Sequence, residues 1–131
     1  MFNSVGILRY SRLDNGDYKL IVEVDTEIVR YYRYLTPKWV VSNPQAYPAH
    51  ISVVRKEEPV FLENWAKYDG HLVEFQYSST VHSGTVYHWL NAFSTRLEEI
   101  RLELGLPVSS PYTRPPDNFS KCFHITIGNR K

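Results

Sequence analysis

The sequence contains a single cysteine, Cys122, so it can form neither an internal disulfide bond nor a zinc site built from several cysteines. It has no run of about 18 apolar residues, the length that a membrane span needs, and no signal-peptide pattern after Met1. Its six glycines are scattered and form no phosphate-binding fingerprint. We therefore expect a cytosolic protein without membrane contact.

An excess of charge of one sign is also missing. Fifteen Lys and Arg residues face fourteen Asp and Glu residues, which gives a net charge of +1. A protein that clamps duplex DNA regardless of sequence needs a basic face to displace counterions from the phosphates. The charge balance therefore argues against duplex DNA as a partner and is compatible with a small anionic ligand held by a few local contacts.

The 131 residues, of which 43% are hydrophobic, suit one domain spanning residues 1–131. The apolar patterns predict strands and helices in the same order in each half of the chain: strand, strand, helix, strand. The predicted strands are residues 4–11, 18–24, 50–55, 71–78, 85–90 and 123–128, and the predicted helices are 26–36, 61–68 (short) and 95–104. This order indicates an α+β domain with helices packed against antiparallel sheet.

Each half ends in the same tetrapeptide pattern, in which histidine, an aliphatic residue, a hydroxyl residue and a second aliphatic residue follow one another. The copies are His50-Ile51-Ser52-Val53 and His124-Ile125-Thr126-Ile127, and the histidines are 74 residues apart. Side chains alternate between the two faces of a strand, so each imidazole projects beside its hydroxyl while the aliphatic pair anchors in the core.

Two such motifs facing one phosphate would form a catalytic site. The hydroxyls of Ser52 and Thr126 would donate to non-bridging oxygens. One of the two histidines, His50 or His124, would act as general base and the other as general acid. Imidazole suits both tasks because its pKa of about 6.5 lies near the working pH. This scheme needs no metal ion and no other cofactor.

The paired motifs, together with the preceding Tyr47-Pro48, resemble those of the 2H phosphoesterases. Within that superfamily the chain is most similar to the small phage-associated branch called Swiss-army-knife RNA-repair-like proteins and to phage anti-CBASS nucleases. The resemblance implies a bilobal fold, in which two pseudo-symmetric antiparallel-sheet lobes carry helices outside and enclose a central cleft. It also implies metal-independent cleavage of 2′,3′-cyclic phosphates or cyclic nucleotides, with His50 and His124 as the catalytic pair. Ser52 departs mildly from the pattern, in which threonine is commoner.

Five further residues are candidates for binding a nucleotide or an RNA end. Tyr10, Tyr47 and Tyr112 could stack on a nucleobase, or could simply pack against the protein. Arg55 follows the first motif and Lys121 precedes the second, so either could neutralise a phosphate, or could lie solvated at a strand end.

Other functions stay open at this stage. His82 and His88 could join Cys122 in a zinc site, and Cys122 could form a nucleophilic pair with His124. The domain could also bind a nucleotide or RNA end without cleaving it, or be purely structural. The leading prediction is a metal-independent phosphodiesterase that cleaves a cyclic or RNA-terminal phosphodiester, in the host cytoplasm if the chain comes from a phage.

Overall fold

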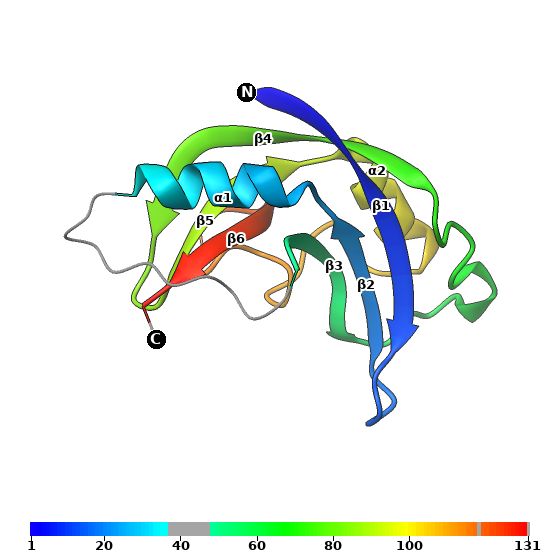
Figure 1. Cartoon of the computed structure of the whole chain (residues 1–131). Helices are drawn as coiled ribbons and strands as arrows, with labels where there is room; N and C mark the ends of the chain where they lie inside the picture. Colours follow the sequence, from blue (N-terminus) through cyan, green and yellow to red (C-terminus); the bar gives the residue numbers. More distant parts are fainter. Residues whose placement is uncertain (37–47, 118, 131) are drawn as a thin grey trace.

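The computed structural model describes residues 1–36, 48–117 and 119–130. Its elements follow the predicted order, and Figure 1 shows their arrangement. The six strands are β1 (Phe2–Arg12), β2 (Tyr18–Glu23), β3 (His50–Glu57), β4 (Leu72–Ser83), β5 (Tyr87–Phe93) and β6 (Phe123–Asn129). The helices are α1 (Thr26–Leu35), α2 (Thr95–Glu103) and the short 3₁₀ helix η1 (Leu62–Asn64).

All six strands belong to one closed antiparallel barrel in the order β1-β2-β3-β6-β5-β4. The strands of the first half therefore lie side by side, as do those of the second half, and two seams join the halves. At one seam β3 pairs with β6, and at the other β1 pairs with β4. The order is symmetric about the seam between β3 and β6, where the two histidine motifs lie.

The prediction of a bilobal α+β fold, with two separate sheet lobes around a central cleft, is wrong. The structure closes both halves into a single barrel that is mostly sheet. The physical reason is the length of β1, whose residues 7–12 pair with β2 while residues 2–7 pair with β4. One strand thus passes from the first half into the second, and no separate lobes remain.

Gly6 lies where β1 passes from one neighbour to the other. A Cβ atom at this position would collide with the side chain of Val22 and lie 2.6 Å from the carbonyl oxygen of Glu23. Only glycine allows this close approach without displacing the adjacent strand.

The core forms on one face of the sheet and includes apolar residues of both helices. Ile51 and Ile125 alternate with polar neighbours along their strands and are fully buried, and Leu20, Val22 and Leu90 are fully buried beside them in the core. Both helices have side-chain caps at their N-termini: the carboxylate of Asp25 accepts from the backbone N–H of Glu27 at 2.9 Å, and the hydroxyl of Ser94 accepts from that of Leu97 at 3.2 Å. The helix α1 packs on β6 (Figure 1).

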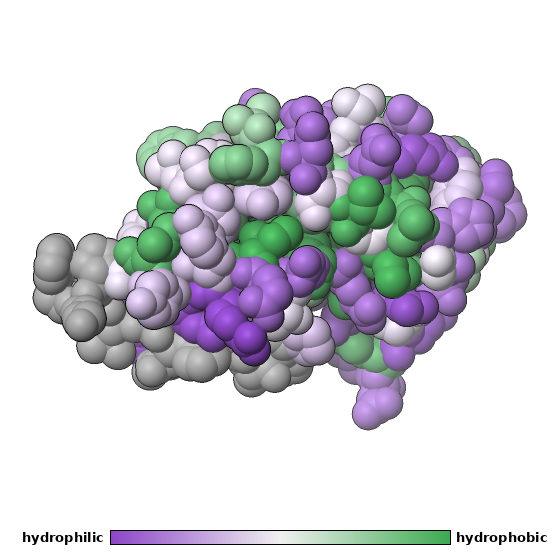
Figure 2. All heavy atoms as spheres, turned by 45° about the horizontal axis from the view of Figure 1, so that its top comes forward, coloured by the Kyte–Doolittle hydropathy of each residue, from purple (hydrophilic) through white to green (hydrophobic). Residues whose placement is uncertain are grey.

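The surface mixes polar and apolar residues. On the face turned forward in Figure 2, apolar patches are interspersed with polar residues. Exposed apolar side chains include Phe2 and Val5 of β1 and Leu72 of β4. Within the described residues, no helix reaches the length and apolar character of a membrane span.

Candidate active site

The seam between β3 and β6 brings the two histidine motifs together. Ile51 lies opposite Ile125 in this antiparallel pair, and both side chains are buried in the core. The ladder therefore places His50 opposite Thr126 and Ser52 opposite His124, with all four side chains on the other face of the sheet. We call this surface the histidine face. Diagonal neighbours in such a ladder lie about 7–8 Å apart, so the two histidines can approach one phosphate from both sides.

Both imidazoles are oriented by a backbone carbonyl group from the loop that precedes their strand. Nδ1 of His50 lies 2.7 Å from the carbonyl oxygen of Pro48, and Nδ1 of His124 lies 3.3 Å from that of Thr113. A carbonyl oxygen can only accept a hydrogen bond, so Nδ1 carries the proton in each ring. In the neutral rings Nε2 then has the lone pair, which is the form that a general base needs.

The electrostatic environment favours the neutral form of both histidines. Burial, with smaller contributions from the nearby charges of His50 and Arg55, lowers the pKa of His124 to about 4, although the hydrogen bond that Nδ1 donates to the carbonyl oxygen of Thr113 opposes this shift. Burial also lowers the pKa of His50, with smaller contributions from the positive charges of Lys19 and Arg55. Positive charge therefore surrounds the histidine pair, as expected of a site for an anion.

Arg55 reaches the histidine face because β3 contains a bulge. Ile21 of β2 lies opposite Ser52, and the preceding residue, Leu20, lies opposite Val54. Val53 is therefore the extra residue of the bulge, and it has no partner of its own on β2. Both valines are fully buried. Simple alternation would place Arg55 on the core face, and the extra residue returns it to the face of Ser52.

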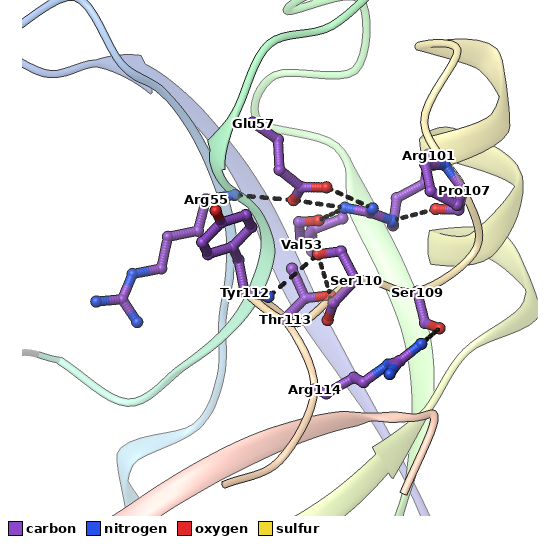
Figure 3. A network of polar contacts seen from close by, with 10 residues as sticks. All are labelled: Val53, Arg55, Glu57, Arg101, Pro107, Ser109, Ser110, Tyr112, Thr113 and Arg114. Atoms are coloured by element: carbon purple, nitrogen blue, oxygen red, sulfur yellow. Dashed lines mark hydrogen bonds and ion pairs between the residues drawn. The ribbon is translucent and has the colours of Figure 1, made fainter. Parts of the chain in front are cut away.

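A buried arginine holds this bulge in place (Figure 3). The side chain of Arg101, from α2, is fully buried and donates to the carbonyl oxygen of Val53 at 2.7 Å. It also forms two hydrogen bonds with the carboxylate of Glu57, at 3.0 and 2.7 Å, and one with the carbonyl oxygen of Pro107, at 2.6 Å. Glu57 accepts in turn from the backbone N–H of Arg55, whose guanidinium points away from this cluster (Figure 3).

The predicted substrate-binding residues occupy different places. Tyr112 lies in the same loop as Thr113 and is 48% exposed, so it can border the site. Tyr47 lies outside the described residues. Tyr10 is not brought to the histidines: it pairs with Leu20, which faces the core, and its ring packs edge-on against Trp65 at 4.9 Å. Lys121 is exposed and lines a small cavity at the edge of the histidine face.

Two residues of the site escaped the sequence analysis. Asn91 of β5 lies opposite His124, and its side chain is fixed by a hydrogen bond from Trp89 at 3.1 Å and another to His82 at 3.3 Å. Lys19 of β2 lies opposite Arg55 and lowers the pKa of His50. Neither position carries a local signal, because both depend on the register between strands that are distant in sequence.

The residues considered for zinc take other roles. His82 contacts Asn91 and stacks on Trp89, and Nδ1 of His88 lies 2.8 Å from the hydroxyl of Ser83. Across residues 1–36, 48–117 and 119–130, no group of three or more His, Cys, Asp and Glu side chains is arranged to hold a metal ion. Burial raises the pKa of the Cys122 thiol, which makes it a weaker nucleophile than an exposed cysteine.

Comparison with known proteins identifies no relative: no family model, no curated protein and no solved structure matches the chain.

Proposed function

We propose that this protein is a phosphodiesterase that cleaves a cyclic or RNA-terminal phosphodiester with His50 and His124 as its general acid–base pair, and that it acts in the cytoplasm. The observation that carries the proposal is the pairing of the two motifs at the seam of β3 and β6, with Ile51 opposite Ile125. This register gathers two imidazoles and two hydroxyls on one face. The resemblance of the motifs to those of 2H phosphoesterases supports the same chemistry.

In the proposed mechanism, one imidazole removes a proton from a water molecule or a ribose hydroxyl as its oxygen attacks phosphorus. The other imidazole protonates the ribose oxygen that departs, so that one P–O bond forms as another breaks. Both tasks fall to Nε2, since Nδ1 of each ring is directed at a carbonyl oxygen. Attack by water opens a cyclic phosphate, whereas attack by a neighbouring 2′-hydroxyl produces one.

Three further groups suit the negative charge of the transition state. Ser52 and Thr126 flank the histidines, and their hydroxyls would donate to the non-bridging oxygens. Arg55 lies on the same face, and its guanidinium forms no ion pair with a carboxylate within the described part of the chain. An anionic substrate would also raise the pKa of the protonated imidazole, which favours the general acid.

Alanine variants of the two histidines test the proposal. The wild type is incubated with 2′,3′-cyclic mononucleotides and with cyclic di- and trinucleotides, in excess EDTA, and product formation is followed by chromatography. We expect turnover in EDTA, and a loss of at least about a hundredfold in H50A and in H124A. H71A is the matched control, because His71 is exposed and lies outside the site, and it should keep wild-type rates.

Circular dichroism and thermal unfolding establish that the variants are folded. Wild-type rates in H50A or H124A would refute the proposal. Tight binding of a nucleotide that stays intact would instead indicate a binding module without catalysis, which is the second candidate from the sequence. Loss of turnover on chelation would indicate a metal-dependent reaction.

A further inference from the structure

A cavity of about 310 Å³ adjoins the histidine face where β5 ends and β6 begins. Asn91, the residue opposite His124, lines it. So do Phe93, two residues further along β5, and Cys122, which immediately precedes β6. A step of two residues along a strand is about 6.6 Å. A nucleoside whose phosphate lies between the histidines can therefore reach this cavity. Its volume is at the lower end of small-molecule pockets, which suits one nucleoside.

The lining has the chemistry of a nucleobase site. Phe93 is 39% exposed, and its ring can offer a surface for stacking. Glu98, from the first turn of α2, and Lys121 both line the cavity, so one acidic and one basic residue border it. These two opposite charges leave the cavity without net charge, so it suits a neutral base better than a second phosphate.

Glu98 differs from the carboxylate beside it. Glu99 pairs with Arg96 at 3.2 Å, whereas Glu98 forms no ion pair with any of the described residues. Glu99 also does not line this cavity. A carboxylate accepts hydrogen bonds from an exocyclic amino group, such as N4 of cytosine, and repels a carbonyl oxygen at the same position.

We propose that this cavity binds the nucleobase of the substrate and that Glu98 selects a base with an exocyclic amino group, so that cytosine is preferred to uracil. The placement of the phosphate rests on the proposed function. The selectivity of the cavity does not require turnover, and it is measured by binding alone.

Calorimetric titration of the full chain with cytidine 3′-monophosphate and uridine 3′-monophosphate tests the selectivity. We expect the wild type to bind the cytidine nucleotide about tenfold more tightly, the effect of one charge-assisted hydrogen bond in a partly solvated site. E98Q should bind both nucleotides with similar affinity, because an amide can present either its oxygen or its NH₂ group. E99Q is the matched control and should keep the wild-type preference.

Two measurements locate the ligand. F93A should weaken both nucleotides to the same extent, since stacking does not distinguish the two pyrimidines. Cys122 is the only thiol of the chain and lines the cavity, so bound nucleotide should slow its alkylation by a maleimide in mildly alkaline buffer.

Equal binding of the two nucleotides by the wild type, binding of neither, an unchanged preference in E98Q or an unprotected Cys122 would each overturn the inference. These results are distinct from a failure of the proposed function. Turnover without base preference would support the phosphodiesterase and refute the nucleobase site. Selective binding without turnover of any cyclic substrate would support the nucleobase site and refute the phosphodiesterase.

Discussion

Replacement of Arg101 by methionine would leave a carboxylate and two carbonyl groups without the donor that now satisfies them. Arg101 is fully buried, its partner Glu57 has a side chain only 9% exposed, and their closest contact is 2.7 Å. Methionine fills a similar volume, so the main loss is electrostatic. Breaking a buried ion pair by removing one partner costs about 3–5 kcal/mol. We expect R101M to lower the free energy of unfolding by this amount, a large part of the roughly 5–15 kcal/mol of a typical domain.

Urea unfolding followed by tryptophan fluorescence measures this loss, and a double-mutant cycle assigns it to the pair. E57L removes the carboxylate, so R101M/E57L should be more stable than the sum of the two single losses implies, by at least about 1–2 kcal/mol. R30M serves as the control, because Arg30 pairs with Glu27 at the surface, and its effect should stay within about 0.5 kcal/mol. A loss below about 1 kcal/mol in R101M, or strict additivity in the double variant, would refute the reasoning.

Three further predictions follow from the site and the barrel. S52A and T126A should each lower kcat by roughly 10²–10³-fold without changing thermal unfolding, because each removes one donor to the transition state; single-turnover rates equal to those of the wild type would exclude this role. Burial lowers the pKa of His124 to about 4. As the pH falls below about 6.5, this imidazole therefore binds a proton in the unfolded chain but stays neutral in the folded chain. The free energy of unfolding should therefore fall by about 1–2 kcal/mol more between pH 7 and pH 5 in the wild type than in H124N, and parallel pH curves in urea titrations would contradict the pKa. G6A should destabilise the protein by about 1–3 kcal/mol, since the added methyl group meets the backbone of Glu23; an unchanged urea midpoint would show that β1 can shift at no cost.

The elements themselves could be predicted from the sequence, whereas their pairing could not. Alternation of apolar residues marks the strands, and the side-chain cap of Asp25 marks the start of α1. The two seams join residues that are tens of positions apart, such as Ile51 with Ile125 and Val5 with Glu74. No local pattern encodes such partners, so the closure of the barrel was missed.

The candidate site, too, could be predicted from the sequence only in part. That each histidine shares a face with its hydroxyl follows from the period of a strand, but that the two pairs are adjacent follows only from the register of β3 and β6. The position of Arg55 on the histidine face depends on a bulge at Val53 and Val54. The sequence does not predict this bulge, because both valines are ordinary core residues. The position of Tyr10 was predictable, because it shares the strand period of the buried Leu8 and so belongs to the core face.

The seam between β3 and β6 has a consequence for how function arises during folding. Its partners are separated by 74 residues, and closing so long a loop carries an entropic cost that local contacts do not. A half-folded chain, or a fragment containing either half alone, would possess one imidazole and no means of proton exchange across a phosphate. The proposed activity would thus appear only once the seam between β3 and β6 has closed, and two inactive fragments that reassemble should regain it by complementation.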